Sequence, residues 1–163
     1  MNYQLPLEKP IYKSCAITGH RGLPSDFDRE RVKAALRALM ADGVESFYNG
    51  LAMGFDLLTA ELILELKKEY PNVKLYGCVP FYGQENLFTE NDKKNYQKII
   101  SQCDEVAILS DRYYKGVYFK RNDYMIEKAD VLFAYCKAEK GGAAYTVRTF
   151  ARKKGFENIV FVE

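Results

Sequence analysis

The chain has 163 residues, of which 48% are hydrophobic and 28% charged, and its formal net charge is +2 at pH 7. These values exclude a disordered, collagenous or coiled-coil chain and predict a single globular domain over residues 1–163. No apolar run approaches the ~20 residues that cross a bilayer, and the N-terminus lacks a secretory signal, so we expect no membrane partner. The net charge is too small to indicate nucleic acid or an anionic membrane by itself.

The cysteine and histidine content limits the chemistry that the chain can carry. Four cysteines (Cys15, Cys78, Cys103 and Cys136) are far apart and form no C-x-x-C pair, and there is one histidine. We therefore expect structural thiols, a reducing cytoplasmic location and no metal site. No motif requires a cofactor.

Six short apolar runs rich in β-branched and aromatic residues predict strands. They are Cys15–Thr18, Ser46–Tyr48, Val73–Val79, Val106–Leu109, Val131–Tyr135 and Ile159–Val162.

Helical patterns separate these strands. The first has apolar positions from Val32 to Met40, with Ser25 or Asp26 as its N-terminal cap and Gly43 as a left-handed residue after its end. The others are Phe55–Tyr70, a helix that follows a Thr89 cap and extends to Cys103, Phe119–Lys128 and Tyr145–Lys154.

The alternation of strand and helix predicts parallel strands joined by right-handed crossovers. The expected fold is a three-layer, Rossmann-like α/β domain, with an open and mainly parallel sheet and helices on both faces. Residues 1–12 are expected to form an arm outside this core.

Ligands of open parallel sheets bind beyond the carboxyl ends of the strands, so the loops there carry the candidate site. Three of four such loops place glycines before a predicted helix, whose free N–H groups attract anions. Arg21 adds a fork-shaped phosphate donor. The loops therefore predict a cradle for phosphate or phosphosugar, although each glycine could instead serve a tight turn. The candidates are Thr18, Gly19, His20, Arg21, Asn49, Gly50, Gly54, Asp56, Ser110, Gly141, Gly142 and Thr146.

Three side chains are weak candidates for proton transfer. His20 could donate to a ligand or act as a general base, or it could bond only to loop backbone. Asp56 and Glu61 lie near the start of the second predicted helix, where a carboxylate also favours the helix dipole. The absence of the G-x-x-x-x-G-K-[ST] and G-x-G-x-x-G patterns disfavours a P-loop NTPase and ordinary dinucleotide binding.

Aromatic and cationic residues are interleaved between Arg112 and Asn122. Such a pattern can stack bases and neutralise phosphates. We expect Tyr118 and Phe119 to pack a helix onto the sheet, because aromatic residues mostly serve cores. Tyr113 and Tyr114 are better candidates for a base platform or a lid.

Several motifs occur together in a recognisable order. They are Thr18-Gly19-His20-Arg21, Asn49-Gly50-x-Ala52-x-Gly54-x-Asp56-x-x-x-Ala60-Glu61, Val79-Pro80-Phe81, Asp92-Lys93-x-x-Tyr96, Arg121-Asn122-x-x-Met125 and Gly141-Gly142-x-x-x-Thr146. This set resembles the YpsA-like family of the SLOG superfamily. The resemblance implies a Rossmann-like fold and a nucleotide or nucleotide-derived ligand, and it adds Arg121 and Asn122 to the site.

The superfamily also contains the cytokinin-activating phosphoribohydrolases and the DNA-processing protein DprA, and the chain departs from the first of these. The hydrolases carry P-G-G-x-G-T-x-x-E, whose glutamate acts on the ribose–base bond. In this chain the glutamate position is Arg148. The phosphate-holding part is kept while the hydrolytic carboxylate is missing, unless Glu61 or Asp56 substitutes for it.

Three functions follow from the sequence. The first is a sensing or regulatory domain that binds a nucleotide-derived small molecule without clear catalysis. The alternatives are a hydrolase that cleaves N-glycosidic bonds and, third, single-stranded DNA binding as in DprA, which the low net charge disfavours. The 13 tyrosines and 10 phenylalanines also leave aromatic surface for a homodimer.

Overall fold

The computed structural model describes residues 10–163, in which strands and helices alternate along the chain. The strands are β1 (Ser14–Gly19), β2 (Ser46–Asn49), β3 (Lys74–Val79), β4 (Glu105–Ile108), β5 (Val131–Tyr135) and β6 (Ile159–Phe161). The helices are α1 (Arg29–Ala41), α2 (Phe55–Leu66), α3 (Glu90–Gln102), α4 (Val117–Lys128) and α5 (Gly142–Lys154). Two short 3₁₀ helices, η1 (Gln84–Leu87) and η2 (Phe156–Asn158), precede α3 and β6.

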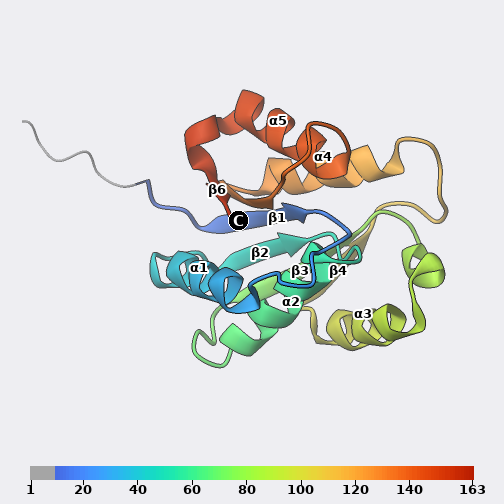
Figure 1. Ribbon diagram of the computed structural model, residues 1–163, viewed down its shortest axis with the longest axis horizontal. Helices are drawn as coiled ribbons and strands as arrows, with labels where there is room; N and C mark the ends of the chain where they lie inside the picture. The colour runs from blue at the N-terminus through green and yellow to red at the C-terminus, as the bar shows by residue number, and fades with distance from the viewer. Residues whose placement is uncertain (1–9) are drawn as a thin grey trace, which may run out of the picture.

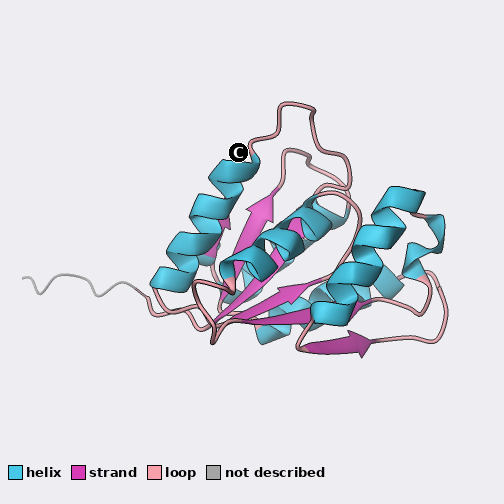
Figure 2. Ribbon diagram, turned by 90° about the horizontal axis from the view of Figure 1, so that it is seen from below, coloured by secondary structure: helices cyan, strands magenta, loops and turns pink. Residues whose placement is uncertain are grey.

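All six strands form one parallel sheet in the order β4-β3-β2-β1-β5-β6. Helices α1, α2 and α3 cover one face of this sheet, and α4 and α5 cover the other (Figure 1 and Figure 2). The predicted three-layer, Rossmann-like fold is therefore confirmed. The strand order reverses beside β1, because β2 follows on one side and β5 lies on the other, so a crevice is expected at this point.

The central strands are buried on both faces, which is why they appear in the sequence as unbroken apolar runs. Ile17 of β1 belongs to the core beneath α1, α2 and α3, whereas its neighbour Ala16 belongs to the core beneath α4 and α5. Cys15 and Cys78 are also buried, and burial raises the pKa of the Cys78 thiol to about 12. Both cysteines therefore act as small apolar side chains.

Most predicted helix boundaries are close to those observed, and two differ for clear local reasons. The cap of α1 is Asp28, whose side chain accepts from the backbone N–H of Arg31 (3.1 Å), so the predicted cap at Ser25 or Asp26 was wrong. A turn that closes from Phe27 N–H to Pro24 C=O (3.1 Å) delays the helix to this point. Helix α2 ends at Leu66, before the predicted end at Tyr70, because the chain continues there as turns.

The other predicted ends are closer. Thr89 caps α3 by accepting from Asp92 N–H (3.2 Å), and Gly43 has a φ of +116°, both as expected. Helices α4 and α5 begin at Val117 and Gly142, slightly earlier than predicted. None of the helices within residues 10–163 is long and apolar enough to span a membrane.

The predicted N-terminal arm falls mainly outside the described residues, since residues 1–9 are not described. Within the described part, the Tyr12 hydroxyl donates to Asn158 Oδ1 (2.8 Å). Residue 12 is therefore joined to the segment that leads into β6.

Candidate functional site

A cavity of about 330 Å³, here called the polar cavity, opens where the strand order reverses. The carboxyl end of β1, the loops after β1 and β2, the start of α2, helix α4 and the start of α5 contribute its walls. Of the predicted site residues it brings together eight, which are Thr18, Gly19, His20, Arg21, Asp56, Arg121, Asn122 and Gly142. The predicted convergence of loops is therefore present for the loops after β1, β2 and β5.

The start of α5 keeps the open geometry expected of an anion site. Gly141 has a φ of +102°, and, apart from its two chain neighbours, no described residue has an atom within 4 Å of where its Cβ would be. At Gly142 a Cβ would meet only the amide nitrogen of Asn122, at 3.9 Å. The first N–H groups of a helix have no partner within it, and Gly142 and Ala143 line the polar cavity. This end of α5 can therefore receive an anion.

The start of α2 has the same sequence signature but is filled by protein atoms. Gly54 has a φ of +80°, and a Cβ there would overlap the backbone of His20 and Arg21. The backbone N–H of Phe55 donates to the His20 carbonyl (3.0 Å), so the helix start is packed against the loop after β1. A Cβ on Gly19 would overlap the Phe55 ring in the same contact. Gly54 thus serves packing and does not line the polar cavity, contrary to its predicted binding role.

Gly50 also serves packing, because a Cβ there would overlap the guanidinium of Arg121. The Gly50→Ala substitution is therefore expected to lower the free energy of unfolding by about 2 kcal/mol through overpacking. Urea denaturation measures this effect. Gly22→Ala is the matched control, since no described residue other than its chain neighbours lies within 4 Å of its Cβ position, and it is expected to change stability by less than ~0.5 kcal/mol. Equal stability of both variants would contradict the packing role of Gly50.

Asn49 and Thr146 are buried beside the site but point their polar atoms into the protein. The Asn49 amide donates to Asp56 C=O (2.8 Å), and its Oδ1 accepts from Leu51 N–H (2.8 Å). These bonds hold the loop after β2, in which Leu51 has a φ of +55°. Thr146 Oγ1 donates to the Gly142 carbonyl (2.9 Å). Neither residue lines the polar cavity, so both are positioning residues rather than the predicted ligand contacts.

Ser110 and Glu61 lie away from the polar cavity, contrary to their predicted roles. Ser110 Oγ donates to the Arg112 carbonyl (2.7 Å) in an exposed turn after β4. Glu61 is on the exposed face of α2, where its carboxylate lies 3.7 Å from Arg29. Asp56 lies about 1.4 helical turns earlier in α2, so the helical period places it on the inner face, away from Glu61.

Asp56 is the most unusual residue of the polar cavity. Its side chain is only 7% exposed, and Oδ2 accepts from Ala52 N–H (3.3 Å). Within the described residues, Oδ1 is buried and has no hydrogen-bond partner. Burial raises the pKa of Asp56 to about 6, although Arg121, the Ala52 N–H and Arg21 act in the opposite direction. An unpaired buried acceptor is costly and is expected to serve a ligand.

Arg121 is buried on the same wall, and its Nε and Nη1 donate to protein atoms. Its Nη1 donates to the carbonyls of Gly50 (2.9 Å) and Cys78 (3.4 Å), and its Nε donates to Asn122 Oδ1 (2.9 Å). Burial lowers the pKa of the Arg121 guanidinium. Arg121 therefore ties α4 to the ends of β2 and β3, and it supplies positive charge near Asp56.

His20 lines the cavity, but its ring is already used. Its Nε2 accepts from Lys137 N–H (2.8 Å), and the ring lies edge-on to Tyr135 at 5.3 Å. Of the alternatives for His20, the bond to loop backbone is the one that the structure shows, and it occupies Nε2. Only the other ring nitrogen can face a ligand.

Two aromatic residues of α4 line the polar cavity although they were expected to pack α4 onto the sheet. Phe119 is 48% exposed, and its ring centroid lies 4.6 Å from that of Tyr145. Val117 and Met125 are instead buried apolar residues of α4. Tyr118 lies under the Arg21 guanidinium, whose carbon is 5.0 Å from the ring centroid. The spacing of Tyr118, Arg121, Asn122 and Met125 places them on one helix face, a signal that the sequence does contain.

A family model described as the YspA SLOG family (YpsA) matches residues 26–160 of this chain. The chain belongs to the YpsA family of SLOG domains. Two curated relatives, UPF0398 proteins of Bacillus cereus strain AH820 and Bacillus thuringiensis strain Al Hakam, are each 35% identical over 156 residues. Each alignment covers 92% of this chain and 79% of the relative.

Two solved structures of DNA processing protein A share the fold of this YpsA-family chain. The Helicobacter pylori protein, described for its single-stranded DNA binding mode, aligns with a TM-score of 0.65 and 21% identity. The Streptococcus pneumoniae protein aligns with a TM-score of 0.53 and 14% identity. The alignments cover 93% of this chain but only 65% and 58% of those chains.

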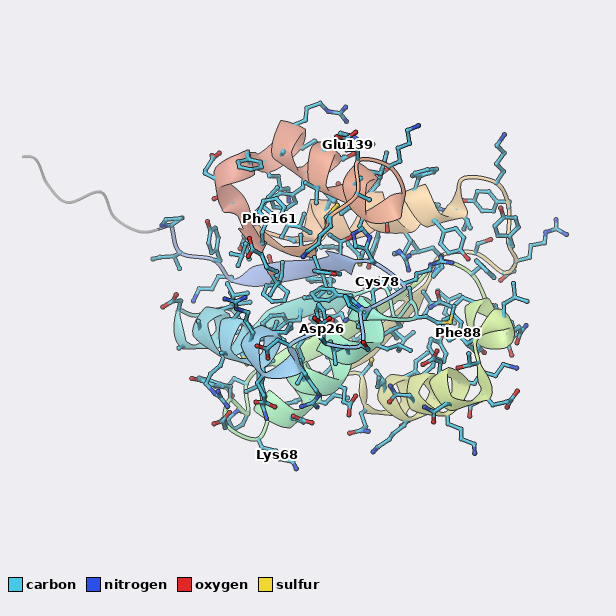
Figure 3. All side chains as sticks on the ribbon, viewed as in Figure 1. Asp26, Lys68, Cys78, Phe88, Glu139 and Phe161 are labelled. Carbon is cyan, nitrogen blue, oxygen red and sulfur yellow. The ribbon has the colours of Figure 1, made fainter. Side chains whose placement is uncertain are left out.

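The YpsA-family chain also shows what replaces the phosphoribohydrolase glutamate. Arg148 Nη1 donates to the carbonyl of Glu139 (2.6 Å), the residue labelled in Figure 3 in the loop before α5. Arg148 therefore holds that loop against the helix and does not line the polar cavity. Asp56 is thus the only carboxylate among the residues that the described structure places around this cavity.

Proposed function

We propose that this YpsA-family protein binds a nucleotide-derived ligand in the polar cavity and acts as a sensing or regulatory domain. One observation carries the proposal. The open start of α5 and the unpartnered Asp56 Oδ1 belong to the same cavity, with Arg21 on its rim. The helix start attracts an anion, whereas the carboxylate requires a hydrogen-bond donor.

A ribose phosphate supplies both groups within one small molecule. Its phosphate can accept from the N–H groups of Gly142 and Ala143, and its hydroxyl can donate to Asp56. Free inorganic phosphate bound at the start of α5 has no separate ribose hydroxyl to donate to the buried Oδ1. The site therefore favours a phosphorylated ribose over phosphate alone.

Thermal unfolding with a panel of nucleotides tests the proposal. A ligand at ~100 times its dissociation constant stabilises the fold by ~2.7 kcal/mol, which corresponds to a rise in Tm of about 5–10 °C for a chain of this size. We expect ribose-containing phosphates to give this shift and inorganic phosphate to give less. No shift with any nucleotide, nucleotide sugar or dinucleotide would overturn the proposal.

An N-glycosidic hydrolase is a second candidate because of one specific feature of Asp56. Its raised pKa of about 6 suits a carboxyl group to proton transfer near neutral pH. The other two catalytic candidates are less suitable, since Glu61 lies outside the cavity and His20 Nε2 already accepts a bond. Release of free base from AMP by the parent protein, lost in Asp56→Asn, would support this alternative. No release would exclude it for that substrate.

Single-stranded DNA binding is the third candidate, and the fold shared with DprA supports it. The exposed Tyr113 and Tyr114 lie beside Arg112 and Lys115 in the loop before α4. Binding through phosphate contacts would weaken steeply with salt, so an oligothymidylate titration at two salt concentrations tests it.

Two further expectations stay predictions. The four cysteines are free in the described structure, in keeping with a reducing, cytoplasmic location. Self-association as a homodimer is tested by light scattering coupled to size-exclusion chromatography.

A further inference from the structure

A second cavity of about 450 Å³ adjoins the polar cavity and has a different character. We call it the aromatic chamber. It lies between the end of β3, η1 and the loop before α4, and its walls include Met53, Phe81, Leu87, Phe88, Tyr113 and Tyr118. Figure 3 labels Phe88 beside the short helix η1. Most of this lining is apolar or aromatic, in contrast to the charged wall around Asp56 and Arg121.

Three rings form an ordered group on one side of the aromatic chamber. Phe81 meets Tyr113 and Tyr118 edge-on, with ring centroids 5.6 Å and 5.8 Å apart. Despite these contacts, Tyr113 is 59% exposed and Leu87 on another wall is 92% exposed. Exposed apolar side chains that gather around a cavity mark a binding surface, since a bound apolar group would cover them.

The two cavities share the pair formed by Arg21 and Tyr118, which line both. The Arg21 guanidinium carbon lies 5.0 Å from the centroid of the Tyr118 ring, and Arg21 is exposed to solvent. A molecule held by its anion at the start of α5 can therefore extend past this pair into the aromatic chamber.

We propose that the aromatic chamber receives the planar base of a nucleotide whose phosphate lies at the start of α5. This inference rests on the proposed function and names its ligand class as a base-bearing nucleotide rather than a sugar phosphate alone. The aromatic rings supply the faces on which a base stacks, which tolerates different bases. Arg21 lies between the two cavities, where its guanidinium can contact the ligand between base and phosphate.

Isothermal titration calorimetry tests this inference by measuring the affinities of AMP and of ribose 5-phosphate. The parent protein is expected to bind AMP at least about tenfold more tightly than ribose 5-phosphate, because loss of one base–aromatic stack lowers affinity by a factor of this order. The Tyr113→Ala variant is expected to lose about tenfold in AMP affinity and to keep its ribose 5-phosphate affinity within about twofold. Tyr113 is exposed, so its replacement is not expected to disturb folding.

Tyr114→Ala is the matched control. Tyr114 is the adjacent tyrosine, is 42% exposed and does not line the aromatic chamber, so neither affinity is expected to change. Equal binding of the two probes by the parent protein, or an equal loss for both probes in Tyr113→Ala, would overturn the aromatic chamber as a base site and leave the proposed function intact. Failure of both probes to bind the parent protein would overturn the base site, whereas the proposed function is overturned only if the full nucleotide panel also fails to stabilise the fold.

Discussion

The Asp56→Asn variant is expected to be more stable than the parent protein at neutral and alkaline pH. The pKa of Asp56 rises from its ordinary value of 3.8 to about 6 on folding, chiefly through burial. Folding is therefore favoured fully when Asp56 is protonated in both states, at pH values below the pKa of the unfolded chain. This contribution to the free energy of unfolding is lost as the pH rises through the pKa of the folded protein. A shift of this size corresponds to about 3 kcal/mol lost once both states are ionised. Asparagine does not titrate, so the variant avoids this loss.

Urea denaturation at two pH values measures the effect. The stability advantage of Asp56→Asn over the parent protein is expected to grow by about 2 kcal/mol between pH 4.5 and pH 8. Glu61→Gln is the control, because Glu61 is an exposed carboxylate of the same helix, and its effect is expected to stay below ~0.5 kcal/mol. A variant that becomes less stable than the parent as pH rises would show that Arg121 stabilises the ionised carboxylate more than burial penalises it.

The same substitution is expected to weaken ligand binding. In the variant we expect the asparagine oxygen to take the place of Oδ2 and accept from Ala52 N–H. The asparagine NH₂ group then takes the place of Oδ1, and it cannot accept a hydrogen bond from a ligand hydroxyl. Loss of a hydrogen bond to a charged group lowers affinity by about ten- to a hundredfold. Higher stability together with weaker binding would identify Asp56 as a residue kept for function at the expense of stability.

The Gly142→Asp variant is expected to lose most of its affinity for phosphorylated ligands and still fold normally. The new carboxylate would lie in the first turn of α5, where an anion is favourable for the helix. It would also occupy the place of the ligand anion and repel it, at a cost of about 3 kcal/mol or a hundredfold in affinity. Space at this position is sufficient, because among the described residues, outside the adjoining backbone of α5, a Cβ would meet only the Asn122 amide within 4 Å.

Gly142→Asn separates the effect of charge from that of size. Asparagine has the shape of aspartate without its charge, so this control is expected to lose much less affinity. Titration of AMP into both variants and chemical denaturation of both measure binding and folding separately. If the two variants bind AMP equally weakly, steric exclusion rather than anion binding at the start of α5 explains the loss.

Local sequence patterns determined most of the fold because its strands and helices are buried in a regular way. Val131–Tyr135 was predicted with its observed bounds, since β5 is buried on both faces and therefore apolar throughout. The boundary at α1 was missed because Ser25, Asp26 and Asp28 can all cap a helix, and only the turn at Pro24 decides between them. Helix α2 was predicted too long because turns that follow a helix keep its apolar spacing.

The candidate site was less predictable, because two loops with similar glycine patterns have opposite roles. Gly54 and Gly142 both begin helices, yet Gly54 is packed against the backbone of Arg21 while Gly142 faces open space. Nothing local to either loop distinguishes them, because the atoms that fill the first come from a distant strand end.

The sequence by itself determined the family, the order of strands and helices, and the strand ends at which the polar cavity opens. Only the tertiary structure decided which residues line the polar cavity. It placed Glu61 on the outer surface of α2, occupied His20 Nε2 with a backbone bond, and left Asp56 Oδ1 buried and unpaired. The physical reason is that backbone patterns depend on neighbours in the chain, whereas burial and hydrogen-bond pairing depend on residues that only folding brings together.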